Sequence, residues 1–178
     1  MPDILINYFK TPVGEMILGS FEEQLCLADW RYRSMRTTID KRIRKGLNAE
    51  YKEGGTDVIE LARMQLSEYF AGERTSFDVP LHMVGTDFQK RVWKALIDVP
   101  HGTTSTYAAL TEVVAEKTAI RAVAGANGAN AISIIIPCHR IIGSTGELVG
   151  YAGGLSAKKK LLQLEGVLVG EPELFPTD

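Results

Sequence analysis

The chain has 178 residues, of which 45% are hydrophobic, and a formal net charge of −2. This length suits one ordinary domain or two small ones with an apolar core, and the composition excludes an intrinsically disordered protein. No run of eighteen apolar residues occurs, and the amino terminus lacks a basic region followed by an apolar one. We therefore expect neither a membrane span nor a signal peptide, and we predict a cytoplasmic protein.

Only two cysteines occur, Cys26 and Cys138, and neither lies in a Cys-x-x-Cys spacing. A disulfide framework and a structural zinc site are therefore not expected, and we predict no metal and no cofactor. A reducing compartment suits a working thiol.

The charge is distributed unevenly along the chain. Residues 86–167 contain nine Lys and Arg against six Asp and Glu, whereas residues 1–85 contain eleven against thirteen. The net charge alone argues against a nucleic-acid-binding protein, but the part that contains Cys138 has the sign that phosphate attracts.

In chain order, residues 4–30 alternate short apolar runs with turns, which predicts a small antiparallel sheet. Residues 31–45 hold seven basic residues and one acid, which fits either a solvated helix face or a phosphate contact. Thr56 then caps a predicted helix, and Gly72 ends it. The apolar stripe of that helix consists of Ile59, Ala62, Leu66 and Tyr69.

A domain boundary is predicted near residue 80, where Pro80 interrupts a stretch without helical periodicity. We expect an α+β protein with a small N-terminal sheet and helix domain, residues 1–80. A mainly helical domain, residues 81–167, would follow, with residues 168–178 as a tail.

The second predicted domain begins with a capping box at Thr86 and Gln89, and its first helix ends before Pro100. Ser105 or Thr106 can cap the next helix. After a short break at residues 116–118, another helix is predicted over 119–128. Two short helices joined by a tight turn are the outline of a winged helix-turn-helix-like DNA-binding motif.

The second helix of this motif consists almost entirely of small residues, with Arg121 as its one charge. Its two glycines, Gly125 and Gly128, each cost about 1 kcal/mol against alanine in a helix interior. Either the glycines allow close helix packing in the core, or they let the backbone approach a DNA groove while Arg121 reaches in. A major-groove reader normally has several Asn, Gln and Arg side chains, so the helix indicates sequence-independent binding.

Ile134 to Ile136 predict a short buried strand, which Pro137 ends because it has no amide proton. Cys138 should therefore lie at a fixed turn. A free cysteine in such a context is most often a packing residue. Against that reading, Pro137, Cys138, His139 and Arg140 place a thiol, an imidazole and a guanidinium together where a core would favour leucine.

Beyond the Cys138 segment, residues 143–146 predict a turn and residues 150–154 a glycine-rich loop. Ser156 is expected to cap the last helix. Lys158 to Lys160 near its start and Glu165 at its end both oppose the helix dipole. Glu165 would thus be better placed with a cationic or N–H partner, and an imidazole is a candidate.

In combination, these motifs resemble the O6-alkylguanine-DNA alkyltransferases, the methylated-DNA–protein-cysteine methyltransferases. The motifs that carry the resemblance are Phe88-Gln89 with Val92-Trp93, Gly102-x-Thr104-x-x-Tyr107, Arg121-Ala122-Val123, Asn130, Pro137-Cys138-His139-Arg140, Tyr151-Ala152-Gly153-Gly154-Leu155, and Leu161-Leu162 to Glu165-Gly166. The resemblance covers about residues 85–166 well and the first domain only loosely, so the role of that domain stays unassigned.

The resemblance implies that Cys138 accepts an alkyl group, with His139 linked to it through a water and Glu165 holding His139. Tyr107 would help rotate the target nucleotide and protonate guanine N3, and Arg121 would fill the gap left in the duplex. The other implied residues are Thr106 and Ala122 at the DNA, and Pro137, Asn130, Tyr151 and Ala152 around the substrate pocket. If Cys138 and His139 lie in extended backbone, their side chains point to opposite faces, which is a separate reason to expect the bridging water.

The implied function is direct DNA repair: a single-turnover transfer from O6-alkylguanine in double-stranded DNA to Cys138, by a monomer without a cofactor. Some members of the family bind zinc in the N-terminal domain, but only Cys26 and His82 are available here, so no zinc is expected. Two rivals are a cysteine hydrolase using Cys138, His139 and Asn130, and an alkyltransferase-like protein that binds lesions without repairing them. Relatives of the second kind lack the cysteine.

Overall fold

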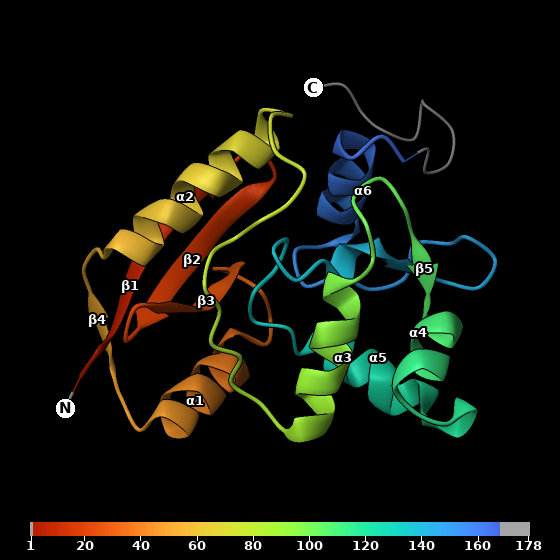
Figure 1. Cartoon of the computed structure of the whole chain (residues 1–178), viewed down its shortest axis with the longest axis horizontal. Helices are drawn as coiled ribbons and strands as arrows, with labels where there is room; N and C mark the ends of the chain where they lie inside the picture. Colours follow the sequence, from red (N-terminus) through yellow and green to blue (C-terminus); the bar gives the residue numbers. More distant parts are fainter. Residues whose placement is uncertain (1, 168–178) are drawn as a thin grey trace.

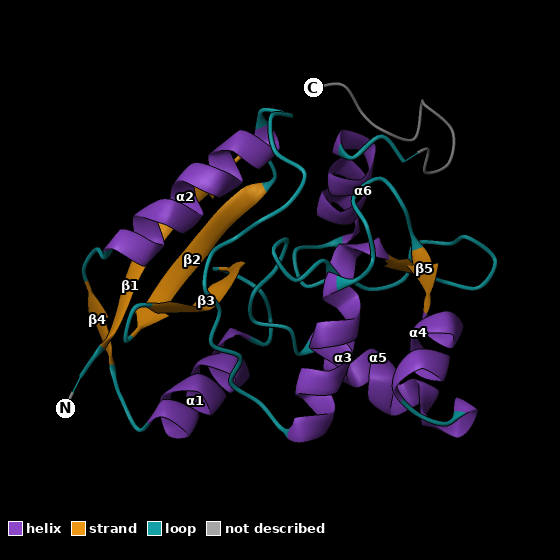
Figure 2. Ribbon diagram, in the orientation of Figure 1, coloured by secondary structure: helices purple, strands orange, loops and turns teal. Residues whose placement is uncertain are grey.

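The structure is a computed structural model that describes residues 2–167. The first half of the chain forms a sheet flanked by two helices, and the second half is mainly helical (Figures 1 and 2). This is the α+β arrangement that the sequence predicts. The predicted tail, residues 168–178, lies outside the described residues.

The sheet has four strands in the order β3-β2-β1-β4. The predicted antiparallel part is confirmed, because β1 (Ile4–Thr11), β2 (Gly14–Phe21) and β3 (Gln24–Trp30) pair in succession as antiparallel neighbours. The sequence does not predict β4 (Tyr51–Glu53), which adds to β1 in parallel. Its three residues lie in a polar, glycine-containing stretch without a strand pattern of its own.

Helices cover both faces of the sheet. On one face, α2 (Asp57–Phe70) packs its predicted stripe against apolar side chains such as Leu18 of β2. As predicted, Thr56 caps α2: its Oγ1 accepts a hydrogen bond from the Ile59 amide at 3.2 Å. On the other face, α1 (Arg36–Leu47) packs against the opposite side chains of the same strands, Ile17 among them.

The second half is built on α3 (Asp87–Ile97), α4 (Tyr107–Val114) and α5 (Ile120–Gly128). The predicted capping box is present at the start of α3, and Thr106 caps α4. The predicted break between α4 and α5 contains a turn of 3-10 helix, η1 (Lys117–Ala119). These two short helices give the predicted helix-turn-helix outline beside α3.

Two short strands also lie in this half, one just before α4 and one after α5. β5 (Ser105–Thr106) pairs in parallel with β6 (Ile141–Ile142), and α6 spans Leu155–Leu164. The predicted Ser156 cap is wrong: the residue at the cap position of α6 is Gly154, two residues earlier, which has φ 92° and provides no side-chain cap. Gly154 can hold this left-handed backbone because it has no Cβ.

The predicted strand at Ile134–Ile136 is also wrong. Residues 132–137 form a tight turn in which Ser133 bridges Ile136 and Ile134 has φ 72°. The side chain of Asn130 stabilises the turn, since its Nδ2 donates to the Ile136 carbonyl at 2.8 Å and its Oδ1 accepts from the Ile132 amide at 2.9 Å. The three isoleucines are buried, as expected, but in a turn.

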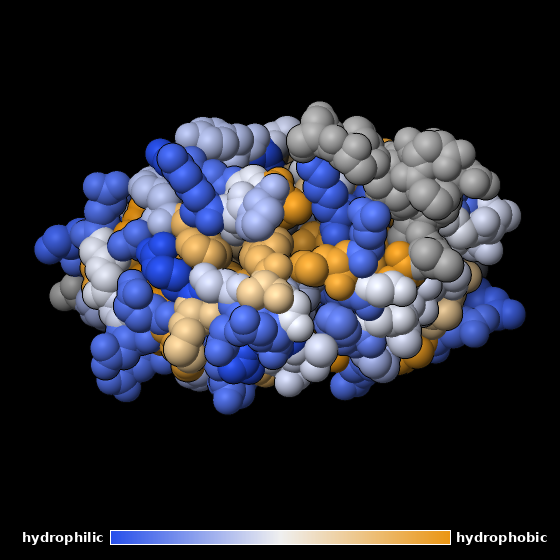
Figure 3. Space-filling view, turned by 90° about the horizontal axis from the view of Figure 1, so that it is seen from above, coloured by the Kyte–Doolittle hydropathy of each residue, from blue (hydrophilic) through white to orange (hydrophobic). Residues whose placement is uncertain are grey.

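A shared core joins the two halves. One cluster of buried residues includes Leu18 of β2, Leu66 of α2, Val92 of α3 and Leu161 of α6. Seen from above, hydrophobic residues gather along the middle of the molecule with hydrophilic ones around them (Figure 3). No helix within residues 2–167 is long and apolar enough to cross a membrane.

Candidate active site

Cys138 begins the turn of 3-10 helix η2 (Cys138–Arg140), directly after the Asn130-braced turn. Its amide donates to the Ile136 carbonyl at 2.8 Å, and its side chain is buried. The predicted fixed turn is therefore confirmed. The expectation of extended backbone at Cys138 and His139 is wrong, because both residues belong to η2.

Glu165, at the C-terminal end of α6, is the centre of a buried hydrogen-bond cluster. Its carboxylate contacts His139 Nε2 at 2.7 Å and accepts from the Tyr69 hydroxyl at 2.6 Å. Arg140 also donates to it, through Nε at 2.8 Å and Nη2 at 3.1 Å. The predicted pairing of Glu165 with an imidazole is thus confirmed as a contact, and the structure adds Tyr69 and Arg140.

This cluster determines the protonation of its members. Burial works to raise the pKa of Glu165, but hydrogen bonds from His139 and Arg140 outweigh it and hold that pKa well below its usual range. Burial lowers the pKa of His139, against the opposing effect of Glu165. The imidazole is therefore neutral at neutral pH, with its Nε2 proton directed at Glu165.

The other ring nitrogen of His139, Nδ1, is buried and has no hydrogen-bond partner in the described part of the chain. In the neutral tautomer that Glu165 selects, Nδ1 is an acceptor, so it can take a proton from a group next to it. Burial raises the pKa of the Cys138 thiol, with a smaller opposing effect of Asn130. The resting thiol is protonated, and a base must assist any reaction in which it is the nucleophile.

A pocket of about 280 Å³ opens at Cys138. The predicted site residues among its lining are Tyr107, Asn130, Cys138, Tyr151 and Ala152. Its rim also includes residues that no motif indicated: Arg33, Ser34 and Met35 from the first half of the chain, and Ala124, Asn127 and Gly128 from α5.

The remaining predicted residues lie elsewhere. His139 and Glu165 are buried and do not line the pocket, and Pro137 lines a different pocket with Arg140 and Phe77. Arg121 and Ala122 are exposed on α5, and Thr106 serves as the cap of α4. The predicted site residues therefore fall mainly into three groups: those that line the pocket at Cys138, those in the buried cluster around Glu165, and those on the exposed surface of α5.

The two glycines of α5 face open space. A Cβ built on Gly125 or Gly128 would have no atom within 4 Å apart from the backbone of its own helix. Of the two explanations for these glycines, close packing in the core is therefore wrong. What remains is a bare helix surface beside the pocket that a large ligand can approach closely.

Lys158, in the first turn of α6, is fully buried, which its position against the helix dipole did not indicate. Its Nζ donates to the carbonyl oxygens of Ile141, Val149 and Gly150 at 2.6, 3.1 and 3.2 Å. Burial lowers its pKa to about 8. Lys158 thus fixes the start of the loop that bears Tyr151.

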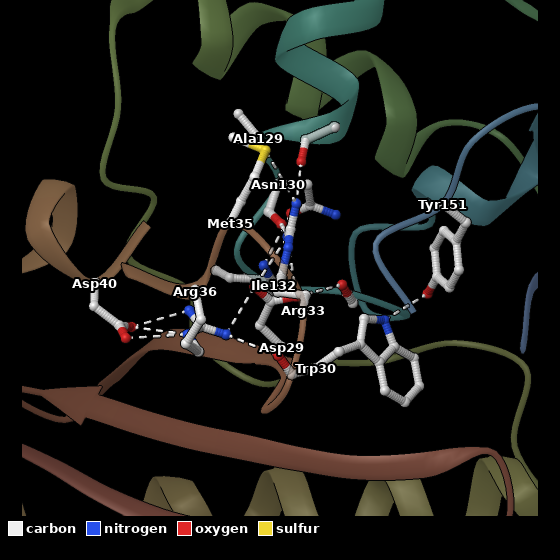
Figure 4. Close-up of polar contacts among 12 residues, drawn as sticks. Asp29, Trp30, Arg33, Met35, Arg36, Asp40, Ala129, Asn130, Ile132 and Tyr151 are labelled. Carbon is white, nitrogen blue, oxygen red and sulfur yellow. Dashed lines mark hydrogen bonds and ion pairs between the residues drawn. The ribbon is translucent and has the colours of Figure 1, made fainter. Parts of the chain in front are cut away.

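The end of β3 fixes the opposite rim of the pocket (Figure 4). Arg33 pairs with buried Asp29 at 3.0 Å and donates to the carbonyls of Asn130 and Gly128 at 3.2 and 2.6 Å. The two contacts with carbonyls join residues 97 and 95 positions apart, and no local pattern could have predicted them. Within residues 2–167, no three His, Cys, Asp or Glu side chains come together as metal ligands would.

Comparison with known families gives two matches that together span most of the chain. Residues 4–83 match the family described as 6-O-methylguanine DNA methyltransferase, ribonuclease-like domain. Residues 87–167 match 6-O-methylguanine DNA methyltransferase, DNA binding domain.

Individual proteins agree with these matches. The chain is 44% identical over 159 residues to a methylated-DNA–protein-cysteine methyltransferase of Methanosarcina barkeri. The aligned residues are 89% of this chain and 95% of that protein. A Mycobacterium bovis protein of the same name is 54% identical over 101 residues, which is 57% of this chain and only 61% of that protein. The crystal structure of Mycobacterium tuberculosis OGT in complex with DNA superposes with a TM-score of 0.77 at 39% identity, covering 90% of this chain and 92% of that one.

Proposed function

Because this chain belongs to the 6-O-methylguanine DNA methyltransferase family, we propose that it repairs DNA by direct reversal of alkylation. It transfers a methyl or other alkyl group from O6 of guanine in double-stranded DNA to the sulfur of its own Cys138. The observation that carries this proposal is a buried thiol at the floor of a pocket, followed in sequence by an imidazole that a buried carboxylate orients.

In the proposed reaction, Cys138 sulfur attacks the alkyl carbon as the bond from that carbon to O6 breaks. The thiol proton passes through a water to Nδ1 of His139, whose imidazolium form Glu165 stabilises. Guanine leaves with the bonding electrons and takes up one proton, at N3 from Tyr107, and the proton on the His139 imidazolium returns through water to the Tyr107 oxygen. One proton thus leaves the thiol and one reaches guanine, so protons balance and no cofactor is required. The product is a thioether, which water does not cleave, so each protein molecule reacts once.

Access to the pocket requires the nucleotide to leave the duplex. Cys138 is only 4% exposed, and a base stacked in a duplex cannot reach such a thiol. We propose that the bare surface of α5 lies against the DNA, with Arg121 filling the gap, Ala122 and Thr106 at the backbone, and Tyr107 at the rotated nucleotide. Asn130, Tyr151 and Ala152 surround the base, and Pro137 sets the turn before the nucleophile.

We further propose that residues 1–80 and 81–167 are two domains that act together as one cytoplasmic monomer. The family matches support this division, since one ends at residue 83 and the other begins at residue 87. The two free cysteines suit a reducing compartment.

The test is to mix the protein with a duplex that contains one O6-methylguanine and to weigh the intact protein. We expect one added methyl, mapped by peptide mass to Cys138, and product that never exceeds the protein added. Cys26 is the internal control, because burial raises its pKa to about 12 and it does not line the pocket that opens at Cys138. Cys26→Ala should react normally and Cys138→Ser should not react, whereas sustained turnover or a methyl on Cys26 would contradict the proposal.

Arg121→Ala should slow repair in a duplex more than reaction with free O6-benzylguanine, because an inserted arginine matters only where a base stack must be filled. Single-turnover rates on both substrates measure this. Lys117→Ala removes a neighbouring exposed charge and is the matched control. Both variants should bind DNA with a shallower salt dependence, but equal losses on both substrates for Arg121→Ala would exclude the finger role.

A further inference from the structure

Trp30, the last residue of β3, links the N-terminal sheet to the pocket loop. Its indole Nε1 donates a hydrogen bond to the Tyr151 hydroxyl at 3.1 Å (Figure 4). The two rings meet edge to face, with centroids 6.0 Å apart and planes at 71°. Trp30 is only 4% exposed, so the indole itself is shielded from water.

The indole is also wedged against the backbone of the same loop. A Cβ built on Gly153 would lie 2.8 Å from Trp30 Cε2, which is closer than such contacts allow. On the other side, a Cβ on Gly14, the first residue of β2, would lie 3.5 Å from the indole. The indole therefore fills the space between the sheet and the pocket loop.

This loop depends on such a support. Gly150 and Gly154 have φ of 58° and 92°, and glycines give the backbone between them freedom to move. Lys158 holds the start of the loop at Val149 and Gly150. Beyond that point, Trp30 supports Tyr151 through its hydroxyl and Gly153 through its backbone.

Tyr151 stands between Trp30 and the reacting groups. It lines the Cys138 pocket, and its ring meets the His139 ring edge to face with centroids 6.4 Å apart. A displacement of Tyr151 would therefore alter both the space beside Cys138 and the packing of His139.

We propose that Trp30 is a positioning residue that fixes the Tyr151 wall of the pocket and thereby limits the size of the O6-alkyl group that reacts. This inference rests on the proposed function and gives the N-terminal domain a part in substrate selection. Trp30 acts through Tyr151 and does not itself line the pocket.

Trp30→Phe removes the N–H donor and one of the two rings, so the Tyr151 wall loses its support. Methyl transfer should slow by about 3- to 30-fold, because small displacements of a bound reactant cost rate steeply. Transfer of a bulky benzyl group should slow less, because this group gains from the wider pocket. The ratio of the benzyl rate to the methyl rate should therefore rise by about tenfold.

Single-turnover rates on duplexes with O6-methylguanine or O6-benzylguanine test this in wild type, Trp30→Phe, Tyr151→Phe and the double variant. Because the hydrogen bond joins the two side chains, Trp30→Phe should change the ratio much less in the Tyr151→Phe background than in wild type. Tyr151→Phe keeps the ring, and it should raise the ratio in the same direction even if Trp30→Phe does not fold.

Trp93→Phe is the matched control. Trp93 is similarly buried, but it donates its Nε1 proton to the Ala126 carbonyl of α5 at 2.8 Å and not to Tyr151. Trp93→Phe should reduce the stability of the protein without changing the ratio of the benzyl rate to the methyl rate. An unchanged ratio in Trp30→Phe, additive effects in the double variant, or an equal change in Trp93→Phe would overturn the inference. A wild-type protein that transfers no methyl would instead refute the proposed function.

Discussion

Replacing Glu165 with Gln should slow alkyl transfer by about ten- to a thousandfold while DNA affinity stays nearly unchanged, a range typical of general-base assistance. Gln keeps the volume of the side chain but removes the charge that stabilises an imidazolium at His139. It also turns one acceptor oxygen into a donor amide among groups that are themselves donors, Tyr69 and Arg140. The orientation of His139 would be weakened together with its basicity.

The pH dependence of the same reaction gives a second readout. The proposed relay needs neutral His139, and burial lowers the pKa of this group from its usual value near 6.5. The wild-type rate should therefore hold through neutral pH and fall only below about pH 6.5. Since Glu165 acts to raise the pKa of His139, Glu165→Gln should move this acid limb to still lower pH while reducing the maximum rate.

Single-turnover rates between pH 5 and 8 measure both effects. Glu68→Gln is the control, because Glu68 pairs with Arg74 at the half-exposed surface, so this substitution should change neither rate nor profile. If folded Glu165→Gln reacts at the wild-type rate with the wild-type profile, Glu165 has no part in the relay.

Local chemistry explains which elements could be predicted. The caps at Thr56 and Thr86 act within three residues of the chain, so the sequence alone indicates where α2 and α3 begin. The pairing of Glu165 with His139 was predictable for a related reason: an acid at a helix C-terminus opposes the dipole and is better placed with a hydrogen-bond donor. That argument indicated an imidazole as a candidate, and the family resemblance pointed to His139, 26 residues away.

Non-local contacts explain what could not be predicted. The β-branched run at Ile134–Ile136 favours a strand, but the Asn130 side chain closes it into a turn that no propensity describes. Lys158 has a charge that normally remains in water, and only the carbonyls gathered around it make its burial tolerable. Trp30 and Arg33 contact the pocket residues Tyr151 and Asn130 from another part of the chain, across more than 90 residues.

Arg140→Met should cost about 3 to 5 kcal/mol in the free energy of unfolding, because it leaves the buried Glu165 carboxylate without its cationic partner. Methionine keeps the apolar stem of arginine, so the loss reports the guanidinium. The matched control is Arg74→Met, which breaks the half-exposed pair with Glu68 and should cost only about 0 to 1 kcal/mol. Urea unfolding of the three proteins at neutral pH measures the difference.

Lowering the pH should reduce the difference in the free energy of unfolding between wild type and Arg140→Met. Hydrogen bonds hold the pKa of Glu165 below its unfolded value of about 4.3, so the ionised carboxylate contributes stability above that pH and loses it as the pH falls. Without Arg140, the pKa of Glu165 in the folded protein is higher, and protonation relieves the unpaired charge sooner. Wild type should therefore lose more stability than Arg140→Met between about pH 5 and pH 3. A gap that stays constant over this range would mean that Arg140 stabilises the fold through packing and its bond to the Val99 carbonyl instead of through the charge on Glu165.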